Sequence, residues 1–504
     1  MPPPSNANAA FAPAVNGSAS ASPFPSVEIS QGSPAQVPIV AVASYRSPIT
    51  STDIGDARSA LAGRGRWAGV ELVASEVEAV LRTLGASRAA VGGHLDTAPD
   101  ATTLMADLAT HRDRLGFIRA DEVGPGVRAL AWGRLQLFGV HHLTDLKAWP
   151  LMARMPSTQP GVAPYDPGTT WTLWAAGDIG LDRMVAKVVT LEHKGVDYPY
   201  SGGTARIARL VCCSPFGWKV PVVAKTGHPG TMRDLIQSAD IALANMEESA
   251  PNHFSYHPHG TVFTGNPALL AGVARAGVDV ASCASTHIGD GGRPGILETV
   301  ANMKRYGIAA FGCGPNLAAA RRPAWFTIDG VRVAILGYDG ISSRYYGAGQ
   351  HTIGDAPLNG TYIRQDVAAA RAAGAQVVIV FPHWGTEYTF GPTSQQQRLA
   401  HLAIDSGADM VIGNHPHWVQ SLEVYKGKPI WYALGNFTFD QSWSEQTLEG
   451  VTLELTFRGP TLVQAWMVPH VLVDAVQPNL LDPGADGQRV LAPVFKASGR
   501  LLPW

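Results

Sequence analysis

The sequence lacks the features that define several large classes of protein. Charged residues make up only 15% of the 504 positions, the net charge is -2 and no basic run occurs, so sequence-independent binding to nucleic acid is not expected. No stretch reaches the roughly 18 uninterrupted apolar residues of a membrane helix. A Walker loop, a GxGxxG turn after a strand and a GxSxG elbow are all absent. The sequence therefore predicts neither nucleotide-driven polymerisation nor a nucleotide cofactor.

Cysteine is also scarce. The chain has four cysteines, and none of them has the CxxC spacing of a zinc ribbon or a thioredoxin-type site. They could form one bridge or remain reduced in the core, and the sequence favours reduced, buried thiols. The four residues are Cys212, Cys213, Cys283 and Cys313.

The N-terminal segment differs in composition from the rest. Residues 1–36 are rich in Pro, Ala, Ser, Gly and Asn, which predicts a flexible leader. The segment has neither the charged n-region nor the apolar h-region of an intact signal peptide. Leaders of this kind often follow a signal or anchor that has been removed. The location stays open, with the cell envelope or the outside of the cell as the expectation.

Two further regions precede the main body of the chain. Residues 37–139 alternate strand and helix patterns and predict a small α/β domain. The order of its elements resembles one lobe of a periplasmic ligand-binding protein, and on that resemblance alone the domain would bind a small ligand. Residues 140–170 are rich in Pro, Gly and Thr and predict a linker.

From Trp171 onward, apolar strand patterns alternate with helix patterns that end at glycine. This alternation predicts largely parallel strands with helices over both faces of the sheets. The segment from Leu448 alternates with a period of two residues, which predicts antiparallel strands near the end of the chain. We assign residues 171–460 to one α/β domain and residues 461–504 to a C-terminal strand extension.

Histidine or carboxylate follows the apolar run in three segments: TLWAAGDIGLD (172–182), VVIVFPHWGTEY (377–388) and DMVIGNHPHW (409–418). Ligands collect at the carboxyl ends of strands in α/β proteins, so these side chains are candidates for one site. His415 and His417 give the strongest signal. Imidazoles spaced i and i+2 share a face only on an extended or loop backbone.

The ordered motifs resemble those of the CapA family, which is tied to capsule and poly-γ-glutamate synthesis. The resemblance covers about residues 171–460. It implies a domain similar to calcineurin-like metallophosphoesterases, that is, a layered α-β-β-α sandwich preceded here by the small α/β domain. The motifs are GDIGLDR (177–183), NMEESAP (245–251), THIGDGG (286–292), HWGTEY (383–388), GNHPHW (413–418) and YALGNFTFD (432–440).

The same resemblance implies a divalent metal site of one or two ions, with Mn, Zn or Fe favoured by imidazole and carboxylate ligands. Glu247 would hold the bridging carboxylate position. The full set of implied metal ligands is Asp178, Glu247, His383, His415 and His417.

Three other residues are implied in catalysis. His287 would meet the leaving-group oxygen as general acid. Arg183 could clamp an oxyanion through two hydrogen bonds. Asp290 would orient a histidine by a hydrogen bond, and Glu387 would do the same.

The sequence departs from the pattern of the family and superfamily at three positions. Gly180 stands where calcineurin-like enzymes have an imidazole, Thr286 replaces an amide ligand, and Asn414 replaces the first histidine of a His-His-Pro-His run. These departures favour one metal over two. Simpler interpretations also exist for other residues: His383 could cap a strand and Asn436 could fix a turn. The His-rich segment 253–260 is interpreted as polar surface.

Two functions therefore compete. The first is a metal-dependent hydrolase or transferase that acts on a phosphoester or an anionic polymer. The second is a non-catalytic accessory protein that binds or helps export such a polymer through a degenerate metal site. Both hypotheses allow other capsule-synthesis proteins as partners.

Overall fold

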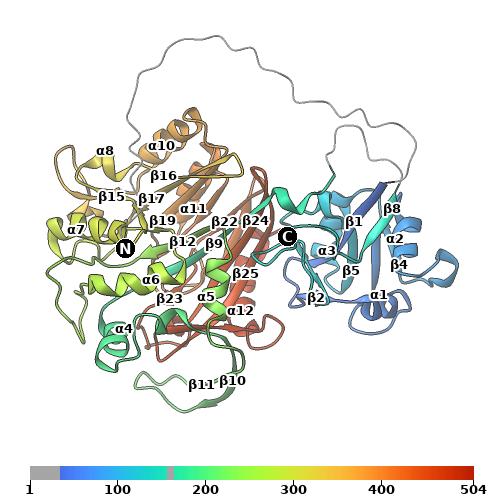
Figure 1. Cartoon of the computed structure of the whole chain (residues 1–504), viewed down its shortest axis with the longest axis horizontal. Helices are drawn as coiled ribbons and strands as arrows, with labels where there is room; N and C mark the ends of the chain where they lie inside the picture. Colours follow the sequence, from blue (N-terminus) through green and yellow to red (C-terminus); the bar gives the residue numbers. More distant parts are fainter. Residues whose placement is uncertain (1–34, 156–163) are drawn as a thin grey trace, which may run out of the picture.

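The computed structural model describes residues 35–155 and 164–504. Nearly all of the predicted leader lies outside these residues. Figure 1 shows a smaller N-terminal body, in blue, beside a larger body that contains the rest of the chain. Within the described residues, no helix has both the length and the hydropathy that crossing a membrane requires.

The N-terminal body is built on a sheet of order β4-β3-β5-β1-β6, with β8 also paired to β1. Its core contains Val42, Leu72 and Phe117 from neighbouring strands, together with apolar residues of the helices. The strands are β1 (Ala35–Ser44), β3 (Gly69–Val73), β4 (Leu95–Ala98), β5 (Arg114–Arg119), β6 (Val127–Ala129) and β8 (Met152–Met155), and the short pair is β2 (Ser51–Thr52) with β7 (Ala131–Trp132). The helices are α1 (Ile54–Leu61), α2 (Val77–Thr83) and α3 (Ala101–Thr110).

The first sheet of the larger body has the order β11-β10-β26-β25-β24-β9-β12-β13-β14, and β23 pairs with β9. Strands β9, β12, β13, β14 and β23 run parallel, whereas β24 and β25 pair antiparallel as the period-two pattern predicted. The strands are β9 (Thr170–Ile179), β10 (Thr204–Val211), β11 (Val220–Lys225), β12 (Ile241–Met246), β13 (Val280–Ser282), β14 (Ala309–Phe311), β23 (Asn436–Thr438), β24 (Glu449–Arg458), β25 (Thr461–Val473) and β26 (Gln477–Leu481).

The second sheet has the order β16-β17-β19-β20-β22-β21, with β17, β19, β20 and β22 parallel. A short pair, β15 (Cys313–Gly314) with β18 (Gly354–Asp355), lies outside both sheets. The strands are β16 (Ala324–Ile328), β17 (Val331–Asp339), β19 (Val377–His383), β20 (Met410–Ile412), β21 (Leu422–Tyr425) and β22 (Lys428–Trp431).

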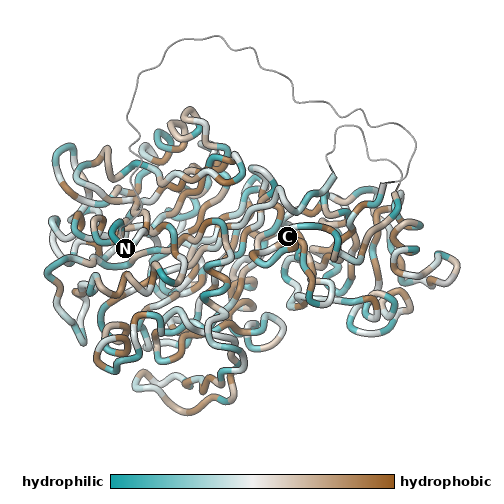
Figure 2. Tube along the Cα trace, in the orientation of Figure 1, coloured by the Kyte–Doolittle hydropathy of each residue, from teal (hydrophilic) through white to brown (hydrophobic). Residues whose placement is uncertain are grey.

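Three apolar layers hold the larger body together. The middle layer joins the two sheets, because it contains Leu173 and Leu243 of the first and Ile335 and Ile379 of the second. Helices cover the outer face of each sheet through separate clusters, and Figure 2 shows the apolar strands inside and the hydrophilic loops outside. The predicted α-β-β-α sandwich is confirmed. The helices are α4 (Arg183–Ala186), α5 (Thr231–Gln237), α6 (Leu270–Ala276), α7 (Gly292–Arg305), α8 (Leu317–Ala320), α9 (Ser343–Tyr346), α10 (Gly360–Ala372), α11 (Ser394–Asp405) and α12 (Gln488–Ser498).

Two of the predicted boundaries differ from the structure. Strand β8 lies within the predicted linker 140–170 but completes the N-terminal sheet, because Val37 and Ala153 pair in register. The predicted extension 461–504 is part of the sandwich, since β25 pairs with β24 along its length and α12 packs into the middle layer.

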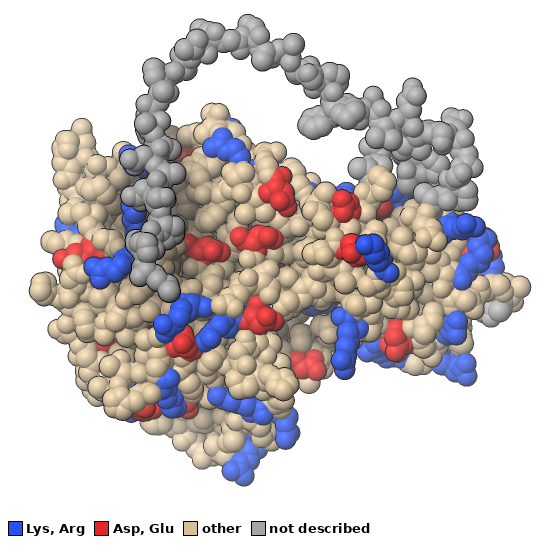
Figure 3. Space-filling model, viewed as in Figure 1, with Lys and Arg blue, Asp and Glu red and all other residues tan. Residues whose placement is uncertain are grey.

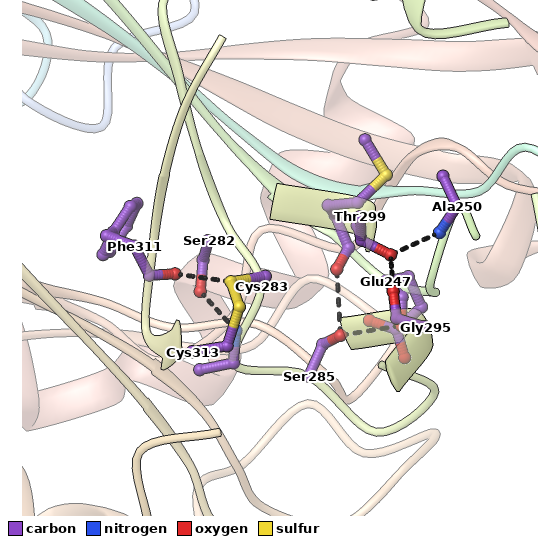
Figure 4. The surroundings of a disulfide bond; sticks show 11 residues. Glu247, Ala250, Ser282, Cys283, Ser285, Gly295, Thr299, Phe311 and Cys313 are labelled. Carbon is purple, nitrogen blue, oxygen red and sulfur yellow. Dashed lines mark hydrogen bonds between the residues drawn. A yellow bond between two sulfur atoms is a disulfide. The ribbon is translucent and has the colours of Figure 1, made fainter. Parts of the chain in front are cut away.

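The cysteines are paired. Cys283 and Cys313 form a disulfide with 5.6 Å between their Cα atoms, Cys212 and Cys213 form another, and no cysteine is free among the described residues. The prediction of reduced thiols is therefore wrong. Figure 4 shows the first bridge near Ser285, whose hydroxyl donates to the carbonyls of Met246 and Glu247 at 2.9 and 2.7 Å.

Candidate metal centre

The candidate site lies where the carboxyl ends of strands from both sheets meet. Asp178 belongs to the end of β9, Glu247 follows β12, and His383 closes β19. His415 and His417 follow β20 in a loop. Parallel strands present their carboxyl ends at one edge, and the two packed sheets bring both edges together. All five predicted metal-ligating residues are buried.

The five side chains converge. Glu247, His415 and His417 place one potential ligand atom each within 4.8 Å of one another, and so do Asp178, Glu247 and His383. Glu247 belongs to both sets. A carboxylate in that position is what two ions sharing a ligand require, and one ion could use either set.

The loop that carries the histidine pair has an unusual backbone. His415 has φ of 97° and His417 has φ of 58°, so both lie in the region that favours glycine. A non-glycine residue there costs free energy and persists where the surrounding structure imposes it. Pro416 separates the two residues, and both imidazoles are buried. The pair converges from a loop, which is one of the two backbone types expected from the sequence.

Several carboxylate and amide oxygens of the site accept no hydrogen bond. Asn245 donates to Asp178 Oδ1 at 2.8 Å and to Glu247 Oε2 at 2.9 Å. Asp178 Oδ2, Glu247 Oε1 and Asn245 Oδ1 are buried without a hydrogen-bond partner. Imidazole nitrogens face two of them, with Nδ1 of His417 3.3 Å from Asp178 Oδ2 and Nε2 of His383 3.4 Å from Glu247 Oε1. Buried acceptors are rarely left unpaired, and a bound cation is one explanation when several occur together. Their chemistry suits a divalent ion such as Mn, Zn or Fe.

Burial and neighbouring charges shift the pKa values of several residues in the site. Burial opposes ionisation of Asp178, but the facing His417 imidazole, 3.3 Å from Oδ2, holds the pKa of Asp178 below its ordinary value. Burial likewise disfavours charged His383, yet the facing Glu247 carboxylate raises the pKa of His383 to about 9. Burial and the neighbouring histidines lower the pKa of His415 well below its ordinary value. A metal binds neutral imidazole. A bound cation would therefore displace the protons that the facing carboxylates stabilise on His383 and His417.

Two polar side chains orient the imidazoles. Asn436, on β23, accepts a hydrogen bond from Nδ1 of His417 at 2.9 Å. Thr286 places its hydroxyl 2.9 Å from Nε2 of His383 and 3.3 Å from Nδ1 of His415. Partners of this kind fix the ring orientation of metal-binding histidines. Asn436 thus does more than fix a turn, and Thr286 lies within the site although it replaces an amide.

His287 and Asp290 lie at the margin of the site. Nδ1 of His287 is 2.9 Å from Asp290 Oδ2, the contact expected of an orienting carboxylate. The His287 ring lies 3.9 Å from the ring of Phe263, measured between centroids. The backbone N–H of His287 donates to the carbonyl of Glu247 at 3.2 Å, which ties its loop to the centre.

Arg183 lies beside two phenylalanine rings, and one of them, Phe263, also contacts His287. Its Nε donates to Asp440 at 2.6 Å, and its guanidinium carbon lies 4.7 Å from the centroid of Phe263 and 5.4 Å from that of Phe439. Phe439 in turn stacks on His417 at 5.2 Å. Nη2 of Arg183 is buried without a hydrogen-bond partner among the described residues.

The Glu248 carboxyl group lies near Gly180, the position where calcineurin-like enzymes have an imidazole. A Cβ atom added to Gly180 would meet the ring of Phe439 at 2.6 Å and Glu248 Oε2 at 3.2 Å. Phe439 and Glu248 therefore leave no room for a histidine there. Glu248 is buried and accepts from the Leu181 N–H at 2.6 Å, and burial raises its pKa well above the ordinary value.

Two expectations concern nearby residues. The segment interpreted as polar surface is exposed at every position except His257, which places Nδ1 2.6 Å from Asp182 Oδ2 and anchors its loop next to Arg183. Glu387 is exposed and makes no hydrogen bond to a histidine among the described residues, so it orients none.

The sequence did not predict that Asn245 and Thr286 contact histidines, or that Asp440 contacts Arg183. Asn245 and Asp440 both lie within motif segments that were singled out. Their polarity next to apolar strands was the available signal. The sequence could not identify the partner, because Asn245 reaches His383 and Asp440 reaches Arg183 only through the fold.

Comparison with known proteins agrees with the motif series. Residues 172–441 match the family described as "Bacterial capsule synthesis protein PGA_cap". The chain is 30% identical over 340 residues to the "Capsule biosynthesis protein CapA" of Bacillus anthracis, covering 66% of this chain and 75% of that protein. It is also 30% identical over 225 residues to a "Probable polyglutamine synthesis accessory protein" of Mycobacterium tuberculosis, covering 40% of this chain and 56% of that one.

Among solved structures, a putative 5'-nucleotidase of Staphylococcus aureus aligns with 65% of this chain and 58% of its own at a TM-score of 0.34 and 10% identity. A likeness at that score carries no argument about function. The family match spans just over half of the chain and contains every candidate ligand. The chain therefore belongs to the bacterial capsule synthesis protein family PGA_cap, and the resemblance predicted from its motifs is confirmed.

Proposed function

We propose that this chain is a metal-dependent hydrolase or transferase that acts on phosphoester or related bonds during capsule or poly-γ-glutamate synthesis. The observation that carries the proposal is the convergence of two carboxylates and three histidines around buried oxygens that accept no hydrogen bond. Leaving such atoms unpaired costs free energy, which a divalent cation would recover. The family relatives named for capsule biosynthesis support the biological setting.

Asp178, Glu247, His383, His415 and His417 would hold the metal. When bound, a divalent cation supplies Lewis-acid polarisation and lowers the pKa of water. Nε2 of His287 would give a proton to the leaving-group oxygen, while Asp290 holds the ring through Nδ1. Arg183, fixed by Asp440 and two phenylalanine rings, would hold an anionic oxygen of the substrate through its unpartnered Nη2.

Hydrolysis of bis(p-nitrophenyl) phosphate tests the proposed activity. The full chain with Mn²⁺ or Zn²⁺ should hydrolyse this diester, and treatment with a chelator should reduce the rate at least tenfold because the water-activating ion is removed. Restoring the metal should restore the rate. Absence of hydrolysis above the blank with Mn²⁺, Zn²⁺ and Fe²⁺ would contradict the activity.

A second candidate function is binding of an anionic polymer, and the β10–β11 hairpin favours it. Residues 204–226 contain four cationic side chains and no Asp or Glu. Figure 1 places this hairpin at the lower edge of the molecule, and Figure 3 shows several Lys and Arg side chains there. Trp218 Nε1 donates to the Ser442 carbonyl at 3.2 Å, so the hairpin reaches the loop that follows Asp440.

Removing exposed cations from the hairpin tests this function. The triple change Arg206→Ser, Arg209→Ser and Lys219→Ser should weaken binding of poly-γ-glutamate at least tenfold, measured by calorimetric titration. The attraction between exposed charges is screened by salt, so wild-type affinity should also fall as salt rises.

The matched control changes three exposed cations elsewhere: Arg64→Ser, Lys147→Ser and Lys304→Ser. It has the same net charge as the hairpin variant and should bind like wild type. Equal loss in both variants would show that only net charge matters and would reject the hairpin as the binding surface.

A further inference from the structure

A polar cavity lies between the N-terminal body and the sandwich, outside the metal centre. Strand β6 packs against β25 there. The Gln464 side chain makes the hydrogen bonds to β6 that a neighbouring strand would make, because it accepts from the Ala129 N–H at 2.8 Å and donates to the Val127 carbonyl at 3.0 Å. The cores of the two bodies also meet, because Val463 packs into the N-terminal core and Tyr45 into the sandwich core.

The cavity has a volume of about 170 Å³, several times the roughly 30 Å³ that one water occupies in the liquid. Both polar and apolar side chains contribute to its walls. The lining residues that matter here are Thr50, Arg128, Gln136, Glu454, Trp466 and Met467.

Arg128 is a buried cation without a partner. It is only 6% exposed, its Nε makes no hydrogen bond, and its guanidinium forms no salt bridge among the described residues. Burying an uncompensated charge is strongly unfavourable, and water alone cannot neutralise it. Burial lowers the pKa of Arg128, and Tyr45 and Glu454, neither of them in ion-pair contact with it, offset that effect only in part.

Among the described residues, Glu454 is the only acidic one in the wall of this cavity, and it is also 6% exposed. Its one hydrogen bond among the described residues comes from the Val140 N–H at 3.3 Å. Although Arg128 and Glu454 face the same cavity, they are not within the 4.0 Å of an ion pair. Burial raises the pKa of Glu454, and the Val140 N–H and the charges of His141 and Arg128 offset that effect only in part.

We infer that this cavity binds a small zwitterion of the amino-acid type, with its carboxylate on Arg128 and its ammonium on Glu454. An anion alone would leave Glu454 unpaired, and a cation alone would leave Arg128 unpaired. An amino acid carries both charges on groups attached to one carbon, so it satisfies both residues. Trp466 and Met467 offer apolar contact to a short side chain. The site is independent of the metal centre and of the proposed reaction there.

Calorimetric titration of the full chain with glycine and with L-glutamate tests the inference. At least one of them should bind saturably, and acetate and methylammonium, which carry one charge each, should bind at least tenfold more weakly. Arg128→Met should weaken amino-acid binding at least tenfold. The same variant should melt at or above the wild-type temperature without ligand, because an unpaired buried charge has been removed.

Glu454→Gln provides a second test that does not depend on the Arg128 variant folding. It should reduce amino-acid affinity to that of acetate and leave acetate binding unchanged. The exposed Arg134→Met is the matched control and should behave like wild type. The inference is overturned if neither amino acid binds saturably, if acetate binds as tightly, or if Arg128→Met leaves amino-acid affinity unchanged.

Discussion

His417→Ala should leave the chain with less than a tenth of the bound metal of wild type. The imidazole is buried, contacts Asp178 at 3.3 Å and is oriented by Asn436, so alanine removes a ligand and leaves nothing to replace it. In excess chelator, the variant should melt only slightly below wild type. The lost hydrogen bond is worth about 1–3 kcal/mol in a large domain. Elemental analysis and a thermal melt on one sample measure both effects.

The matched control is His351→Ala, which removes an exposed histidine of the same domain. It should keep full metal content. If His417→Ala retained its metal and lost thermal stability instead, His417 would be a structural residue, and the proposed ligand set would be wrong.

His287→Gln should reduce hydrolysis of a phosphodiester by a factor of about 10²–10⁴, the usual contribution of a positioned general acid. Glutamine keeps the size and polarity of the side chain but cannot transfer a proton. Metal content should stay at the wild-type level, because His287 is held by Asp290 at the margin of the centre. Steady-state kinetics with metal analysis on the same preparation gives the result.

His253→Gln is the control for this experiment, since the same substitution is then made at an exposed position in a nearby loop. Activity of His287→Gln within threefold of wild type would remove the general-acid role. Loss of metal together with activity would instead identify His287 as a ligand.

The candidate ligands could be predicted from the sequence because each follows an apolar run. Asp178, His383 and His415 come at or just after buried strands, and strand ends in α/β domains gather at one edge. The partners of these residues were not accessible in the same way. Thr286 reaches His383 across 97 positions, and Asn436 reaches His417 from a strand paired with β9. Such contacts depend on sheet order, which local patterns leave undetermined.

The disulfide illustrates the same limit. Cys283 and Cys313 each lie just beyond a residue of the parallel pair Ser282 and Phe311 on β13 and β14. Their proximity follows from that register, whereas their spacing in the chain matches no cysteine motif. Strand β8 was missed for a different reason: it is a short strand in a segment rich in proline and glycine, and only pairing with β1 defines it.

The contact between the N-terminal body and the sandwich could not be predicted from the sequence. Arg128 and Glu454 are separated by more than 300 residues, and neither belongs to a recognisable motif. Arg128 reads as an ordinary charged residue near the end of a small domain. Its burial arises because β6 packs against β25.

The central claim is that the unpartnered oxygens of Asp178, Asn245 and Glu247 surround a metal position. The most direct measurement is the metal content of the full wild-type chain purified without chelator, determined by inductively coupled plasma mass spectrometry. The account predicts at least one Mn, Zn or Fe ion per chain. A chain that carries none, and still carries none after incubation with each of these ions followed by desalting, would contradict it.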